Sequence, residues 1–199
     1  VASVMAHRRK ILKTEGNLNN RVGVPQTLLR LNERHKGAVI EMGVDNLGQT
    51  TRLCEIVRPT IGVITNIGPD HLEFFGTMEV SAQAKAEMLD LLPSDGVAIL
   101  NADDSYYDYL AARARCRVVS FGFSSKADVR AMSLKSDGRN GTIFRLLLPG
   151  TMRHAAVHIR VQGDHNVTNA LAAGAVGSIL GLSRGATAQG PSRFRPAAM

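Results

Sequence analysis

Short apolar runs alternate with amphipathic helical stretches through the middle of this chain. Residues 61–65 form a β-branched run without polar alternation, which is typical of a strand covered on both faces. Further strands are predicted at 96–100 and 117–121, and apolar residues recur at helical spacing between the runs. This rhythm predicts an α/β fold, with a mostly parallel sheet flanked by helices.

The elements on either side of this core follow from the same patterns. Two short strands are predicted at 10–13 and 38–41, and a helix is expected to begin near Pro25. The predicted helices of the α/β region cover residues 50–57, 78–92 and 105–115.

The pattern changes after residue 125. Three predicted strands follow with only turn residues between them, which indicates a small antiparallel three-stranded meander at 128–135, 142–148 and 155–161. A last helix, predicted at 166–180, is rich in Ala and Gly, so we expect it to pack closely on its neighbours. Residues 183–199 show no clean period and are expected to be irregular.

Composition and charge limit the classes of function. The 199 residues are 44% hydrophobic and 21% charged, as in an ordinary globular domain. The net charge of +7 would suit either a nucleic-acid binder or an enzyme for anionic ligands. Its basic residues are dispersed and aromatics are only 5%, so we expect no nucleic-acid binding.

The compartment follows from two further observations. No apolar run is long enough to span a membrane, and no secretion signal is apparent at the start. Cys54 and Cys116 lie far apart, near no other candidate metal ligand, so both are expected to be buried thiols. We therefore expect a reduced, cytoplasmic location.

Polar segments follow the predicted strands, where ligands collect in open parallel sheets. Glu41 ends the second strand, and is either a Mg²⁺ ligand or a surface acid. His71 follows the third strand beside Asn66 and Asp70, and is either catalytic or structural. If Glu41 and His71 hold one metal, their side chains must converge on one edge of the sheet.

Lys85 lies in the middle of a predicted helix. Most lysines in that position are solvated, but the neighbours of Lys85 are small, so partial burial is expected. At the start of the last helix, Asn166 and Asn169 share a face, and paired amides there would suit a base edge or a carbonyl. The other interpretation is that Asp164 or Asn166 caps this helix.

Five segments together resemble the central domain of the Mur ligases: TEGNLNNRVGVPQTLL, AVIEMG, VRPTIGVITNIGPDHLEFFG, AKAEML and GDHNVTNALAA. The TEGNLNN loop is most similar to the branch that adds D-alanyl-D-alanine to UDP-N-acetylmuramoyl-tripeptide. The resemblance implies a P-loop-type mononucleotide-binding fold, an ATP-dependent amide ligase of peptidoglycan synthesis, and a monomer. It also implies that an acyl phosphate is made from the carboxylate before the amine attacks.

The resemblance assigns roles residue by residue. Glu41 and His71 would hold Mg²⁺, and Lys85 would be a carbamylated lysine that helps to place a second Mg²⁺. Asn166, Asn169 and His165 would contact ATP. The substrate-binding residues would be Asn17 and Asn20.

One feature departs from the family. No G-x-x-x-x-G-K-[ST] phosphate loop occurs in these residues. We therefore expect residues 1–182 to be a central domain without its P-loop strand, and 183–199 to lead toward a further domain. The alternative is a non-catalytic binding or scaffold module that has lost this loop. In either case the chain alone is expected to be inactive.

Overall fold

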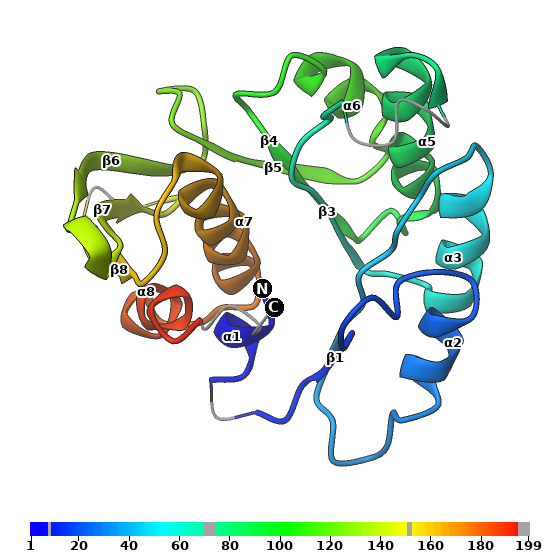
Figure 1. The fold of residues 1–199 in the computed structure, drawn as a ribbon, viewed down its shortest axis with the longest axis horizontal. Helices are drawn as coiled ribbons and strands as arrows, with labels where there is room; N and C mark the ends of the chain where they lie inside the picture. The colour runs from blue at the N-terminus through cyan, green and yellow to red at the C-terminus, as the bar shows by residue number, and fades with distance from the viewer. Residues whose placement is uncertain (8, 70–74, 151–152, 195–199) are drawn as a thin grey trace. The chain divides into compact units, whose positions relative to one another are not determined.

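The computed structural model describes residues 1–7, 9–69, 75–150 and 153–194 (Figure 1). The chain divides into two compact units. Unit 2 consists of Lys10–Leu100 and Asp104–Val118, and unit 1 of Val1–Arg9, Asn101–Asp103 and Val119–Met199. No helix among the described residues is long and apolar enough to cross a membrane.

Unit 2 holds the parallel strand pairs that the sequence predicts. Strands β1 and β2 pair in parallel, as do β3 and β4, with Ile61 opposite Val97 and Ile64 opposite Leu100. The strands are β1 (Leu12–Lys13), β2 (Ala38–Val39), β3 (Ile61–Ile64) and β4 (Val97–Asn101, whose last residue belongs to unit 1). The helices are α2 (Gly23–Leu28), α3 (Gln49–Val57), α5 (Met78–Leu91) and α6 (Tyr107–Arg113).

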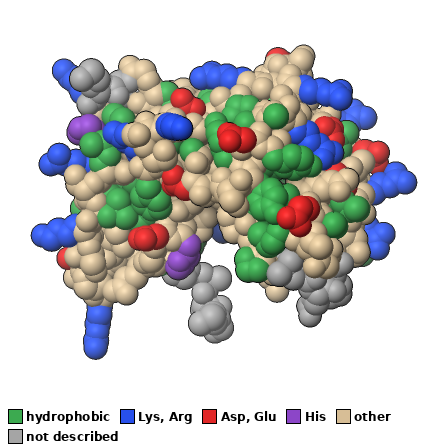
Figure 2. Space-filling model, turned by 90° about the horizontal axis from the view of Figure 1, so that it is seen from above, with side chains coloured by type: hydrophobic (Ala, Val, Ile, Leu, Met, Phe, Trp, Pro, Cys, Tyr) green, Lys and Arg blue, Asp and Glu red, His purple; other side chains and the backbone are tan. Residues whose placement is uncertain are grey.

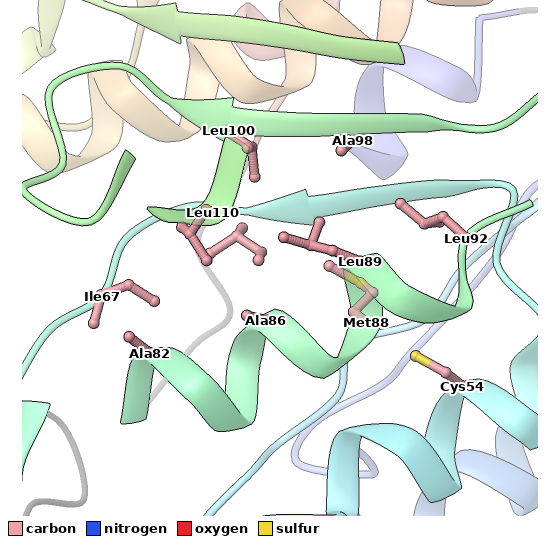
Figure 3. Packing of buried hydrophobic residues seen from close by; sticks show 11 residues of the cluster. Cys54, Ile67, Ala82, Ala86, Met88, Leu89, Leu92, Ala98, Leu100 and Leu110 are labelled. Carbon is pink, nitrogen blue, oxygen red and sulfur yellow. The ribbon is translucent and has the colours of Figure 1, made fainter. Parts of the chain in front are cut away.

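Helix α5 forms one side of the core of unit 2. Thr77 caps its start by accepting a hydrogen bond from the backbone N–H of Val80. Its buried face is mostly small residues, and Figure 3 shows Ala86 and Leu89 among the packed side chains of this core. A Cβ added to Gly62 of β3 would lie 3.0 Å from the Met88 side chain, so the glycine lets helix and strand approach closely.

Unit 1 contains the meander. Strand β5 pairs in parallel with β6, and β6, β7 and β8 then pair antiparallel, as predicted. A bulge interrupts β6 between Met132 and Lys135. The elements of unit 1 are α1 (Ala2–Met5), β5 (Arg117–Gly122, which begins in unit 2), β6 (Val129–Ser136), the 3₁₀ turn η1 (Gly138–Asn140), β7 (Thr142–Leu147), β8 (His154–Ile159), α7 (Asp164–Ile179) and α8 (Arg184–Ser192).

Small residues let three helices of unit 1 pack closely. Gly177 of α7 and Gly190 of α8 both lie against Val4 of α1, which is fully buried. A Cβ on Gly190 would lie 2.4 Å from a methyl of Val4, and one on Gly177 would lie 2.9 Å from the other. The close packing expected of the Ala- and Gly-rich helix is therefore confirmed.

The expectation of an irregular tail was wrong for residues 184–192, which form α8. Ser183 caps this helix by accepting from the backbone N–H of Ala186. The segment lacks a clear apolar stripe because its buried residues are small: Ala186, Thr187, Ala188 and Gly190. Its helicity depends on packing against neighbours that a local pattern does not reveal.

The two cysteines differ in burial. Cys54 belongs to the core of unit 2 and is 2% exposed, as expected. Cys116 is only partly buried, so the expectation of a fully buried thiol was wrong there. Burial raises the pKa of the Cys54 thiol to about 11, with a smaller contribution from the negative charge of Glu87.

Candidate functional site

The loop that begins at Thr14 is fastened to the segment after β2 by three hydrogen bonds. The hydroxyl of Thr14 accepts from the backbone N–H of Glu41 at 2.9 Å. Asn19 donates its side-chain amide to Oε1 of Glu41 at 3.1 Å, and its carbonyl accepts from the N–H of Gly43 at 2.8 Å. The exposed Glu41 carboxylate is thus held in place by a loop far away in the sequence.

The two asparagines selected in that loop do different things. Asn20 uses its side-chain oxygen to accept from the backbone N–H groups of Val22 and Gly23, at 3.0 and 2.9 Å, so it supports the start of α2. Asn17 is exposed in the turn before α2. Neither contacts Glu41 in a described hydrogen bond, and Asn19, which does, was missed.

Lys85 reaches from the middle of α5 to the segment just after β3. Its ammonium donates to the backbone carbonyl of Asn66 at 3.3 Å. The side chain is partly buried, and Ser81 and Leu89, one turn away on each side, are fully buried. The predicted partial burial of Lys85 is therefore confirmed.

The segment after β3 is held from a second side by Asp104. One carboxylate oxygen of Asp104 accepts from the backbone N–H of Ile67 at 2.6 Å. The other accepts from the backbone N–H of Tyr106 at 2.8 Å. Because Lys85 binds the carbonyl of Asn66 and Asp104 binds the next N–H, this turn has a defined backbone conformation. Such a turn can present groups to a ligand with little further loss of conformational entropy on binding.

His71 lies outside the described residues, so its convergence with Glu41 remains a prediction. Across the described ranges, no group of three or more His, Cys, Asp or Glu side chains is gathered as a metal site would require. The Glu41 carboxylate still has one oxygen beyond the one bonded to Asn19, and a hard cation prefers such an oxygen.

The start of α7, in unit 1, carries the other predicted residues. The cap residue is Gly163, and no side chain caps the helix, so the interpretation of Asp164 or Asn166 as the cap was wrong. Asn166 instead donates its side-chain N–H to the carbonyl of Gln162 at 2.7 Å, and the same nitrogen lies 3.0 Å from Nε2 of His165. Asn169 is exposed one turn further on.

Comparison with known proteins bears directly on this arrangement. The Mur ligase middle domain model matches residues 1–177. The chain belongs to the Mur ligase family. The UDP-N-acetylmuramoyl-tripeptide–D-alanyl-D-alanine ligase of Mycobacterium tuberculosis (strain H37Rv) is 37% identical over 183 residues, which cover 92% of this chain and 36% of that protein.

Solved structures agree with this membership. A crystal structure of MurF from Acinetobacter baumannii has a TM-score of 0.92 and 32% identity, covering 98% of this chain and 42% of that one. MurF from Thermotoga maritima, solved in complex with ADP, has a TM-score of 0.84. At 22% identity over 98% of this chain and 44% of that one, this second likeness shows the fold. The chain spans less than half the length of these relatives.

In this Mur ligase domain, two further carboxylates hold the helices around Lys85. Glu87, two residues away on α5, accepts from the backbone N–H groups of Gly48 and Thr51 and from the Thr51 hydroxyl, so it anchors the start of α3. Glu79 accepts from the Tyr106 hydroxyl at 3.2 Å, which ties α5 to the turn before α6. The pKa of Glu79 is lowered by hydrogen bonds from its own backbone N–H and from Thr77, and to a smaller extent by this bond. Neither residue had a motif that would have revealed it.

Proposed function

We propose that this chain is the ATP-handling middle domain of a ligase that joins D-alanyl-D-alanine to UDP-N-acetylmuramoyl-tripeptide in the cytoplasm. The observation that carries the proposal is the bond from Asn19 to Glu41. It links the loop most typical of this branch of the family to the carboxylate proposed to hold the metal. The 37% identity to the UDP-N-acetylmuramoyl-tripeptide–D-alanyl-D-alanine ligase of M. tuberculosis supports the same assignment.

The metal-binding residues would be Glu41 and His71, with Lys85 contributing if it is carbamylated. The Mg²⁺ ion would neutralise charge on the phosphates during phosphoryl transfer. The chain itself orients the Glu41 carboxylate through Asn19 and holds the Lys85 amine against the Asn66 carbonyl.

The nucleotide would be contacted from unit 1 by Asn166, Asn169 and His165. Asn166 donates its side-chain N–H to the carbonyl of Gln162, which fixes the orientation of its amide group. The Oδ1 atom of Asn166 would then be available to accept a hydrogen bond from the base. Asn17 and Asn20 would contact the nucleotide-sugar substrate. Since the oxygen of Asn20 is occupied by α2, its amide N–H groups are the ones available to a phosphate or a carbonyl.

A graft tests the proposal. Residues 1–182 replace the matching stretch of the M. tuberculosis ligase, whose remaining residues are kept. We expect ATP-dependent formation of the amide product, measured as phosphate release together with product mass. A folded graft that binds ATP without forming product would favour the non-catalytic binding module. A folded graft that does not bind ATP would contradict the assignment.

A further inference from the structure

The positive charge of the chain belongs to unit 1 alone. The ranges of unit 1 contain twelve Lys and Arg against four Asp and Glu, whereas unit 2 contains twelve against thirteen. On the face shown in Figure 2, Lys and Arg lie mostly around the outline, without forming one continuous stripe. A charge excess of this size draws anions toward unit 1, but only a local arrangement of donors could bind one specifically.

Such an arrangement exists where the β6–β7 turn meets the end of β8. A hollow of about 440 Å³ is lined by Asp137, Arg139, Asn140, His158 and Arg160. The Asp137 carboxylate also lines the hollow and lies 3.4 Å from a ring nitrogen of His158, so one negative charge stands beside the two guanidinium groups. Among the described residues, no carboxylate lies within ion-pair distance of Arg139 or Arg160, so both guanidinium groups remain available.

The backbone around this hollow is braced. The N–H of Asp137 donates to the carbonyl of Gly141 at 2.9 Å, which closes the turn. Gly141 has a φ of +121°, and a Cβ there would lie 1.9 Å from the carbonyl oxygen of Ile159, so the turn packs directly on β8. The carbonyl of Asn140 also contacts the His158 ring at 3.1 Å. The two arginines therefore project from a fixed frame.

We propose that this hollow is a binding site for a phosphate group, either free phosphate or the phosphate of a small monoester. Guanidinium groups match phosphate oxygens in a bidentate manner, and the two arginines outnumber the one carboxylate of the lining. Phosphate is also small enough for a shallow site of this volume. The site lies on the strand turns, apart from the residues assigned to ATP at the start of α7.

Gln162 connects this site to α7, and the inference about ATP drawn from this connection rests on the proposed function. The side-chain amide of Gln162 donates to the carbonyl of Gly138 in the turn. The backbone carbonyl of Gln162 in turn accepts from the side chain of Asn166 at 2.7 Å. Because Gln162 contacts both the turn and Asn166, we expect an anion bound at the turn to change the surroundings of the amide proposed to contact ATP.

The binding site is tested by titrating the chain with inorganic phosphate or glycerol 3-phosphate, at an ionic strength held constant with chloride. The readout is the backbone amide NMR signals of residues 138–141. We expect saturable shifts, and an apparent Kd at least about tenfold weaker in the Arg139→Gln/Arg160→Gln double variant. Saturation by phosphate alone would identify the free anion as the ligand, and saturation by both would identify a phosphate monoester as well.

The matched control is Arg145→Gln, an exposed arginine on β7 outside the hollow, which should bind as the unchanged chain does. Equal weakening in this control, or shifts that never saturate, would show attraction by net charge alone and overturn the site. If the double variant does not fold, Arg139→Lys/Arg160→Lys replaces it. That variant keeps the charge but loses the bidentate geometry, so it should still bind more weakly.

The link to α7 has its own readout in the same titration. The side-chain amide signal of Asn166 should shift together with the signals of the turn. Gln162→Ala should abolish the shift of the Asn166 signal and leave the shifts of the turn unchanged. A stationary Asn166 signal beside a saturating turn would overturn the link. Failure of the grafted ligase to bind ATP would count against the proposed function, but saturation of the chain by phosphate would still support the phosphate site.

Discussion

Asn19 donates its side-chain amide to the Glu41 carboxylate at 3.1 Å, across 22 residues of sequence. This bond attaches the loop after β1 to the segment after β2, whose strands pair in parallel. The position of the Glu41 carboxylate, which follows β2, therefore depends on the loop that follows β1.

The first prediction concerns this bond. In the grafted ligase, Asn19→Ala should raise the Mg²⁺ concentration for half-maximal activity by about tenfold or more, because a metal-binding carboxylate loses the partner that orients it. Gln26→Ala, an exposed change on α2, is the matched control and should leave the Mg²⁺ dependence unaltered. An unchanged Mg²⁺ dependence in a folded Asn19→Ala graft would show that the bond from Asn19 does not position a metal ligand.

The second prediction concerns Lys85. Lys85→Ala should lower the activity of the graft by about a hundredfold or more, as expected when a group that stabilises charge is removed. Added short carboxylic acids should restore part of this activity if the missing group is a carbamate. Gln83→Ala, an exposed position on the same helix, provides the control. Full activity of Lys85→Ala in bicarbonate-free buffer would return Lys85 to an ordinary surface lysine.

The third prediction compares two glycines of α8. Gly190→Ala should lower the free energy of unfolding by about 1–3 kcal/mol, since the new methyl would collide with Val4. Gly185→Ala meets nothing within 4 Å and should instead stabilise the helix by about 0.5–1 kcal/mol. Denaturant unfolding of both variants measures the difference. Equal effects would mean that α8 does not pack on α1.

The fourth prediction concerns pH. Hydrogen bonds from Arg113, the closest at 2.6 Å, hold the pKa of Asp90 below its usual value of 3.8. A carboxyl whose pKa is depressed on folding stabilises the native state above its unfolded pKa, and this contribution is lost as pH falls through the folded pKa. Because the pair is partly exposed, we expect only about 0.5–1 kcal/mol.

The measurement is the free energy of unfolding of the unchanged chain and of Asp90→Asn. The variant should be less stable at pH 7, and the difference should shrink from about pH 4 downward, where the unfolded carboxyl becomes protonated. Glu55→Gln, at an exposed pair on α3, should have a smaller effect. A difference that persists at pH 2 would mean that Asp90 acts through packing rather than through charge.

Local sequence determined the elements whose stability is decided within a few residues. The β-branched run before Asn66 became β3, and the small residues around Lys85 became a buried helix face. Both follow from side-chain spacing, because a strand repeats every two residues and a helix every 3.6. The same periodicity indicated that Lys85 would be partly buried, although not which carbonyl it would contact.

Tertiary structure alone decided the contacts between distant segments. The loop holds three asparagines, and only the docking of this loop on Gly43 selects Asn19 as the partner of Glu41. Likewise, α8 depends on the fit of Gly190 against Val4, at the other end of the chain. Such contacts are absent from a local pattern because a glycine or an asparagine carries little hydrophobic signal of its own. Their energy comes from shape and hydrogen-bond complementarity, which exists only once the distant partner is in place.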